Sequence, residues 1–211
     1  MNIKAVLFDV DGTLLDTNEY IYQAFEHSLD LHYEPMSREI LQKVMGKPLE
    51  ECYRILTEQE DVTELANAHH VFQVENPHLS MPFPNTLKIL KQLKKDNYSI
   101  AAVTTRARNT AEDTLDESGI LPFLDYFVAI DDVANPKPHA EPVMKAVNYF
   151  GIDPAEAMMV GDSDVDVMAG KNAGVLTVGV SYGFHGESIV EADPDFVIDD
   201  ISEIVEILKK E

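Results

Sequence analysis

Apolar residues along the chain gather in two different patterns. A short apolar run at residues 3–8 is followed at once by a polar turn, which predicts a buried strand. From residue 16 to residue 81, apolar positions such as Ile21, Ala24 and Phe25 recur at three- and four-residue spacing, with no convincing strand among them. This stretch is therefore predicted to be helical.

After Pro84, strand-like and helix-like segments alternate. The predicted strands are 99–103, 126–130, 157–160, 176–180 and 196–198. The predicted helices between them include 87–95, 110–118, 141–150 and 166–173. Alternation of this kind predicts an α/β fold, a parallel sheet with helices on both faces. The first strand is separated from the second by the helical insertion, and we expect it to lie in the centre of the sheet.

Composition and charge narrow the range of partners. The formal net charge of -22 makes nucleic acid and anionic membrane surfaces poor partners, and a phosphate site must supply its own local positive charge. No apolar stretch approaches the length of a membrane span, and the N-terminus lacks the layout of a secretory signal. The single cysteine, Cys52, cannot form an internal disulfide, so we expect a reducing, cytoplasmic setting.

In open parallel sheets, functional groups gather beyond the carboxyl ends of the strands. Asp9 and Asp11 follow the first predicted strand and are two residues apart, so in an extended segment their side chains point to the same side. Two such carboxylates repel each other unless a cation lies between them or they take different roles. Phosphoryl transfer suits both cases, because one carboxylate can attack phosphorus while the other donates a proton. The alternative is a plain acidic turn.

Asp162 and Asp166 form a second acidic cluster after the strand predicted at 157–160. Asp162 leaves the strand end as a candidate metal ligand, and Asp166, about one helical turn later, is a candidate support for it. The alternative for both residues is a helix N-cap with first-turn acids that the helix dipole stabilises.

Thr104, Thr105 and Arg106 follow the strand predicted at 99–103 and are candidate substrate-binding residues. A threonine hydroxyl beside backbone amides at a helix start can hold phosphate oxygens, although an ordinary N-cap explains one of the two threonines equally well. Lys137 lies between two prolines that restrict its loop. In so acidic a chain, a lysine fixed in this way is a candidate partner for phosphate and carboxylate.

Together these residues resemble the haloacid dehalogenase superfamily of hydrolases. Four motifs carry the likeness in the family's order: D-x-D-G-T at 9–13, a threonine after an apolar run at Thr104, K-P at Lys137 and G-D-S-x-x-D at 161–166. Within the superfamily, the chain is most similar to the phosphoglycolate phosphatase and pyrophosphatase group. The resemblance implies a Rossmann-like α/β core, residues 1–15 and 82–211, with an inserted helical cap, residues 16–81.

The resemblance also implies an activity, that of a magnesium-dependent phosphatase that hydrolyses small phosphorylated metabolites through an aspartyl-phosphate. Asp9 would be the nucleophile, and Asp11 the general acid and base. Thr104 would bind phosphate and Lys137 would stabilise the charge. The Mg²⁺ site would combine the Asp9 carboxylate, the Asp11 backbone carbonyl and Asp162. We expect a monomer or a weak homodimer.

Other readings of the sequence remain open. The related β-phosphoglucomutases carry a histidine and an arginine where this chain has Ile21 and Leu49, which weakens a phosphomutase interpretation. A phosphoacceptor signalling domain also uses an acidic pair, a Thr and a Lys, but it lacks the long insertion and an acidic motif after the Lys. A catalytically inactive binding module would have lost a motif residue, and none is lost. Lys47 in the insertion is either a substrate contact or a solvated surface lysine.

Overall fold

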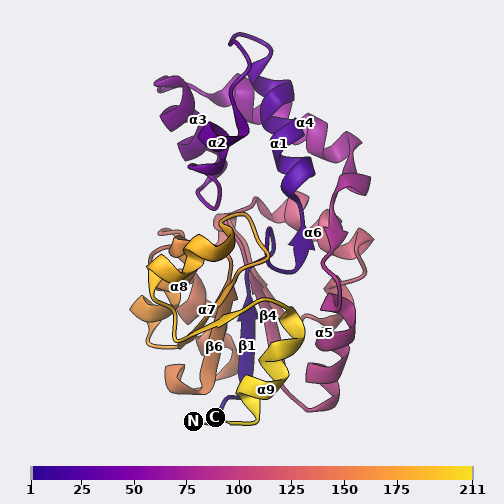
Figure 1. Ribbon diagram of the computed structural model, residues 1–211, viewed down its shortest axis with the longest axis vertical. Helices are drawn as coiled ribbons and strands as arrows, with labels where there is room; N and C mark the ends of the chain where they lie inside the picture. The colour runs from indigo at the N-terminus through magenta and orange to yellow at the C-terminus, as the bar shows by residue number, and fades with distance from the viewer. Residues whose placement is uncertain (1, 211) are drawn as a thin grey trace.

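The centre of the computed structural model, which describes residues 2–210, is a six-stranded sheet in which every neighbouring pair is parallel. The strand order is β5-β4-β1-β6-β7-β8. The strands are β1 (Ala5–Phe8), β4 (Ser99–Val103), β5 (Tyr126–Val128), β6 (Ala157–Gly161), β7 (Leu176–Val180) and β8 (Phe196–Ile198). As expected, β1 lies in the interior of the sheet, between β4 and β6 (Figure 1).

Helices cover both faces of this sheet. They are α5 (Thr86–Lys95), α6 (Arg108–Glu117), α7 (Glu141–Phe150), α8 (Asp164–Ala173) and α9 (Ile204–Leu208). Because side chains alternate along a strand, Val6 and Phe8 of β1 pack with α5, α6 and α9, while Ala5 and Leu7 pack with α7 and α8. All four β1 side chains are fully buried, as the continuous apolar run predicts. The α/β fold class is confirmed.

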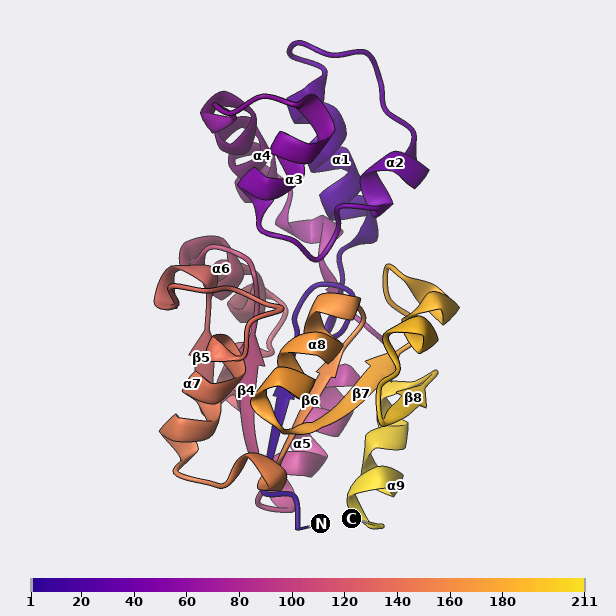
Figure 2. The same ribbon diagram turned by 90° about the vertical axis from the view of Figure 1, so that its left-hand side faces the viewer.

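The insertion forms a separate group of helices above the sheet, seen at the top of Figures 1 and 2. Its helices are α1 (Asn18–Leu29), α2 (Arg38–Gln42), α3 (Leu49–Thr57) and α4 (Thr63–Glu75). They bury a hydrophobic cluster of their own that includes Phe25, Leu41 and Tyr53. We refer to this group as the cap.

A short antiparallel strand pair lies where the chain enters and leaves the cap. Leu15 of β2 (Leu15–Asp16) pairs with Pro82 of β3 (Met81–Pro82), and Asp16 pairs with Met81. Strands of two residues are too short to leave a periodic pattern, so the sequence did not predict them. We propose that this pair divides the chain into a core, residues 1–15 and 82–211, and a cap, residues 16–81.

The remaining elements are short. The 3₁₀ helices are η1 (Pro77–Leu79), η2 (Leu121–Phe123), η3 (Ile130–Asp132), η4 (Pro154–Glu156), η5 (Gly186–Ala192) and η6 (Ile201–Glu203). The strand predicted at 126–130 ends early, because the Asp132 carboxylate accepts a hydrogen bond from the Ala129 amide and starts η3. Within residues 2–210, no helix has the length and apolar character needed to cross a membrane.

Candidate active site

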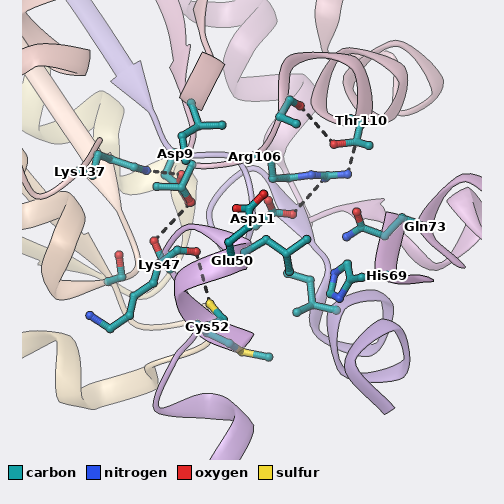
Figure 3. A pocket seen from close by; sticks show the side chains of 18 of the residues that line it. Asp9, Asp11, Lys47, Glu50, Cys52, His69, Gln73, Arg106, Thr110 and Lys137 are labelled. Carbon is teal, nitrogen blue, oxygen red and sulfur yellow. Dashed lines mark hydrogen bonds and ion pairs between the residues drawn. The ribbon is translucent and has the colours of Figure 1, made fainter. Parts of the chain in front are cut away.

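The candidate residues lie together at the carboxyl end of the central strands, on the side of the cap (Figure 3). Asp9 follows β1, Thr104 follows β4 and Asp162 follows β6. Because β4 and β6 both pair with β1 in parallel, their ends meet at one edge of the sheet. Lys137 joins them from the loop before α7.

Lys137 is the residue that connects the motifs. Its ammonium donates to Asp9 Oδ1 at 2.6 Å, to Asp166 Oδ1 at 2.6 Å and to the Val103 carbonyl at 2.9 Å. Burial alone favours the neutral amine, but Asp166 and Asp9 outweigh it and raise the pKa of Lys137 above its ordinary value. The lysine therefore stays charged although its side chain is only 2% exposed.

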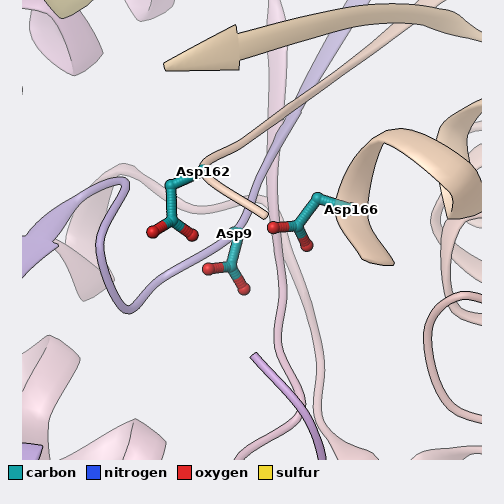
Figure 4. A group of neighbouring side chains, drawn as sticks. All are labelled: Asp9, Asp162 and Asp166. Atoms are coloured by element: carbon teal, nitrogen blue, oxygen red, sulfur yellow. The ribbon is translucent and has the colours of Figure 1, made fainter. Parts of the chain in front are cut away.

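The two carboxylates bound to this lysine, Asp9 and Asp166, form a group with a third, Asp162 (Figure 4). One oxygen from each of Asp9, Asp162 and Asp166 lies within 4.8 Å of the others, and all three residues are buried. One ammonium cannot balance three negative charges, so the cluster suits an additional cation. Carboxylate oxygens are the ligands that Mg²⁺ prefers, and the donor set fits this ion.

The pKa values of the cluster reflect this excess of negative charge. Burial raises the pKa of Asp9 to about 7, with Asp166 and Asp11 adding to the rise and Lys137 opposing it. Burial, followed by the charges of Asp166 and Asp9, also raises the pKa of Asp162 well above its usual range. A divalent cation bound here would favour the ionised form of both groups.

Asp166 has little capacity left for a metal ion. Its Oδ1 accepts from Lys137, and its Oδ2 accepts from the backbone amide and the hydroxyl of Ser163, at 3.2 and 2.5 Å. These bonds cap α8, as the helix-cap interpretation of this residue predicts, and its support of a metal ligand stays a prediction. By contrast, Asp9 Oδ2 and Asp162 Oδ1 accept no hydrogen bond from any residue between 2 and 210.

The backbone around Asp162 leaves no room for a side chain at Gly12 or Gly183. Its Oδ2 accepts from the Phe184 amide at 2.7 Å. Gly12 has a φ of +80°, and a Cβ placed there would lie 2.3 Å from Asp162 Oδ2. A Cβ on Gly183 would lie 2.4 Å from the Gly12 carbonyl oxygen. The glycine of the first motif is therefore needed both for its left-handed conformation and for its contact with the metal-ligand candidate.

Asp11 takes a different position from Asp9. Its Oδ1 accepts from Arg106 Nη1 at 3.3 Å, and it lies outside the group of three carboxylates. The guanidinium is only 11% exposed and is held from the other side by Tyr20, Thr110 and Thr114. The two carboxylates of the first motif therefore have different partners, Lys137 for Asp9 and Arg106 for Asp11.

The two threonines after β4 also differ. Thr104 is buried, and its hydroxyl oxygen accepts from the Arg106 amide at 3.2 Å. Thr105 donates to the carbonyl of Gly46 in the cap at 3.3 Å, so it connects the two parts of the chain. Neither threonine is a helix N-cap, because α6 begins only at Arg108 with Ala107 as its cap.

A cavity of about 150 Å³ lies between the core and the cap over these residues. Asp9, Asp11, Thr105, Arg106 and Lys137 line its core side. Side chains from α1, α3, α4 and the loop before α3 line its cap side: Ile21, Phe25, Met45, Lys47, Leu49, Glu50, Cys52, His69, His70 and Gln73. The candidate chemistry therefore faces a cavity that the core and the cap form together.

Comparisons with known proteins agree with this geometry. The model of the haloacid dehalogenase-like hydrolase family matches residues 6–180. The chain belongs to this family. It is 40% identical over 209 residues to pyrophosphatase PpaX of Bacillus velezensis, covering 97% of this chain and 96% of that protein. It is 38% identical over 211 residues to pyrophosphatase PpaX of a Bacillus cereus strain, covering 99% of this chain and 97% of that protein.

Solved structures of the haloacid dehalogenase-like family share the fold. A predicted phosphoglycolate phosphatase from Haemophilus somnus superposes with a TM-score of 0.89 at 25% identity and covers 98% of both chains. A haloacid dehalogenase-like hydrolase from Streptococcus pneumoniae has a TM-score of 0.86 at 23% identity over 98% of both chains, which shows the fold alone. The comparisons confirm the expected family and the expected class of enzyme, a phosphatase.

Sequence reasoning missed several residues of the site. Tyr20 supports Arg106, Phe184 holds Asp162 through its amide, and Gln73, His69 and His70 line the cavity. His69 forms a hydrogen bond with Tyr53 at 2.9 Å, and within residues 2–210 neither histidine belongs to a group that could hold a metal ion.

The raised carboxylate pKa values predict that magnesium binding depends on pH. Below the pKa of Asp9, about 7, an incoming ion must displace the Asp9 proton, so apparent Mg²⁺ affinity should fall by about tenfold per pH unit, and more steeply where Asp162 is protonated as well. Calorimetric titration between about pH 6 and pH 8, at constant ionic strength, measures this slope. An affinity independent of pH over this range would contradict it.

A second prediction concerns Gly12. Gly12→Ala places a Cβ against Asp162 in addition to straining a positive φ, and we expect it to lower the free energy of unfolding by about 3 kcal/mol and to abolish activity. Gly119→Ala is the matched control, because Gly119 has a φ of +72° with nothing within 4 Å of the added carbon. In this control the free energy of unfolding should fall only by the cost of the left-handed conformation, about 1–2 kcal/mol. Equal losses in urea unfolding would show that the contact with Asp162 is unimportant.

Proposed function

We propose that this chain is a magnesium-dependent phosphatase that hydrolyses small phosphorylated metabolites through an aspartyl-phosphate on Asp9. The observation that carries the proposal is the 2.6 Å bond between Lys137 and Asp9 Oδ1, which fixes a buried carboxylate at the floor of the cavity. Its other oxygen, Oδ2, has no hydrogen-bond partner within residues 2–210. The proposed metal site consists of Asp9, Asp162 and the backbone carbonyl of Asp11.

In the first step, an Asp9 oxygen attacks phosphorus, and the bond between phosphorus and the leaving oxygen breaks. Asp11 gives its proton to that oxygen, which leaves as the hydroxyl of an alcohol, or as that of hydrogen phosphate when the substrate is pyrophosphate. Lys137 offsets the negative charge of the Asp9 carboxylate and of the bound phosphoryl group. Thr104 is proposed to donate its hydroxyl proton, which no bond within residues 2–210 uses, to a phosphoryl oxygen. Thr105 lines the cavity but would have to release the Gly46 carbonyl before it could donate to the same group. Magnesium, when bound, adds positive charge beside the transferring group.

In the second step, Asp11 takes a proton from a water molecule, which attacks the phosphorus of the aspartyl-phosphate. The bond between phosphorus and the Asp9 oxygen breaks, and phosphate leaves with Asp9 restored. The separate partners of the two aspartates support this division of labour. Lys137 keeps one Asp9 oxygen in place, and Asp11 lies outside the buried carboxylate group, beside Arg106.

The size of the cavity supports a small substrate. A volume of about 150 Å³ is close to that of an engineered protein cavity that binds benzene. The Bacillus relatives are named pyrophosphatases, and a neighbour in structure is named a phosphoglycolate phosphatase. We therefore propose compact substrates of these two kinds. The buried single thiol of Cys52 and the negative net charge support a cytoplasmic location.

The alternatives from the sequence have less support. Ile21 and Leu49 both line the cavity, so the positions at which β-phosphoglucomutases carry a histidine and an arginine are apolar inside the site. A silent binding module has no need for a buried lysine between two carboxylates. A signalling phosphoacceptor would leave its aspartate accessible to a partner protein, whereas Asp9 is buried and the cap covers the cavity above it.

The central test is the fate of the intermediate in Asp11→Asn. An aryl phosphate has a leaving group that needs no protonation, so the first step should slow less than the second. The rate of the second step should fall by about 10²–10⁴-fold, because the substituted side chain cannot take a proton from the attacking water. Phosphate should then accumulate on Asp9 and be located by mass spectrometry after denaturation. Asp164→Asn, at an exposed acid of α8, is the control and should accumulate none. Label on Asp11 or Asp162 would contradict the assignment.

The apolar cap positions lead to a prediction about phosphomutase activity. Because Ile21 and Leu49 cannot assist transfer within a sugar, β-glucose 1-phosphate should not be converted to glucose 6-phosphate. A coupled assay for glucose 6-phosphate measures this directly. Efficient conversion would overturn the hydrolase assignment in favour of the phosphomutase.

A further inference from the structure

Within the described residues, the cavity is lined by three permanently cationic side chains, and each of them pairs with a carboxylate. Lys137 is bound to Asp9 and Asp166. The ammonium of Lys47 lies 3.7 Å from Glu51, and its side chain runs away from the catalytic aspartates in Figure 3. Arg106 is the cation that lies beside Asp11, at 3.3 Å from its Oδ1.

The cap adds no further positive charge over the site. Burial lowers the pKa of His69 well below its usual value and lowers that of His70 as well, so both rings are neutral near pH 7. Glu50 brings a carboxylate to the same cavity. Of the cationic side chains that line the cavity, Arg106 is the one beside Asp11, so it is placed to offset an anionic group near the leaving oxygen.

The guanidinium of Arg106 is fixed in place and keeps unused donors. Its Nη2 bonds to the Thr110 carbonyl at 3.1 Å, to Thr114 Oγ1 at 3.0 Å and to Tyr20 Oη at 3.4 Å. Its Nη1 makes one long bond to Asp11, and its buried Nε has no partner among the described residues. An arginine carries five N–H donors, so at least the Nε–H and one Nη1–H are free.

The position of this arginine relates it to the leaving group. In the proposed mechanism Lys137 lies beside the attacking oxygen, and Asp11 protonates the leaving oxygen. Because Arg106 contacts Asp11 rather than Asp9, its guanidinium lies on the leaving-group side of the site. Planar guanidinium groups bind phosphate and carboxylate strongly, often through two parallel hydrogen bonds.

We propose that Arg106 binds a second anionic group on the leaving part of the substrate, and that this contact selects pyrophosphate-like and phosphocarboxylate substrates over neutral phosphomonoesters. The inference rests on the proposed phosphatase function. Phosphate and carboxylate share the chemistry that Arg106 recognises, namely a compact group of oxygens with negative charge near the leaving oxygen. Arg106 then selects substrates by the charge of their leaving part.

Tyr20 makes this recognition depend on the cap. Its hydroxyl donates to the Gln73 carbonyl of α4 at 3.1 Å and accepts from Arg106, and the guanidinium carbon lies 5.5 Å from the centre of its ring. The first and last helices of the cap therefore meet at the residue that supports the arginine. Tyr20 is a positioning residue for Arg106.

The test compares substrates that share a phosphoryl group and differ in the leaving part: pyrophosphate, phosphoglycolate and p-nitrophenyl phosphate. For Arg106→Gln we expect the ratio of kcat/KM for either anionic substrate to that for the aryl phosphate to fall by roughly ten- to hundredfold, since charged hydrogen bonds are lost. Tyr20→Phe should lower the same ratio by a smaller factor. Arg108→Gln is the matched control, because Arg108 is bound to Asp132, 40% exposed and outside the cavity.

An equal loss of kcat/KM for all three substrates in Arg106→Gln would overturn the inference, because it would indicate a role only in holding Asp11. A fall in the kcat/KM ratio for pyrophosphate alone would show that Arg106 recognises a second phosphate group and not a carboxylate. If the wild-type protein with magnesium hydrolysed none of the three substrates, the proposed function itself would fail.

A measurement on the wild-type protein covers the case in which Arg106→Gln does not fold. Phosphonoacetate and methylenediphosphonate, in excess magnesium, should inhibit aryl phosphate hydrolysis at concentrations roughly ten- to hundredfold lower than methylphosphonate. Equal inhibition by all three would overturn the inference without any substitution.

Discussion

The burial of three carboxylates around one lysine is the constraint on which the rest of the site depends. Removing a carboxylate from water costs several kcal/mol even after relaxation. Lys137 offsets part of that cost through its bonds to Asp9 and Asp166, and we propose that a divalent cation offsets the remaining negative charge. A chain with a net charge of -22 can in this way concentrate positive charge where phosphate must bind.

The fold supplies the precision that such a cluster requires. Strands β4, β1 and β6 are adjacent and parallel, so Thr104, Asp9 and Asp162 emerge at one edge without any long loop. Gly12 and Gly183 allow the backbone to approach Asp162 more closely than any side chain would permit. Opposite this rigid floor, the cap touches the core through single contacts such as that of Thr105 with Gly46. The candidate catalytic residues thus come from the ends of the sheet strands, and the cap covers them from the other side of the cavity.

The sequence predicted the parts of this arrangement that depend on local pattern. The buried run of β1 ends at Asp9 because apolar residues on both faces of a strand must stop where the polar edge begins, and that rule also located Thr104 and Asp162. Lys137 was predicted from the order of the family motifs. No periodic pattern could identify it, because it lies in an irregular loop before α7. The family and the α/β fold are confirmed, whereas the roles of individual residues remain proposals.

What the sequence could not predict depends on contacts between distant segments. Tyr20 is an ordinary aromatic residue in an amphipathic helix until the fold places it against Arg106, 86 positions away. The Phe184 amide reaches Asp162 only because the loop after β7 passes over the end of β6. Asp166 serves as both helix cap and partner of Lys137, so the two readings of its sequence position were not exclusive.

Thermal unfolding of Asp162→Asn with and without magnesium tests the central claim most directly. In chelator, removing one of three crowded buried charges should leave the melting temperature equal to or above that of the wild type, because the raised pKa of Asp162 means that its charge is unfavourable there. In saturating magnesium the order should reverse, since an ion at 100 times its Kd stabilises the wild type by about 2.7 kcal/mol. A variant that is less stable by the same amount in both conditions would contradict the claim that this cluster is built to bind a cation.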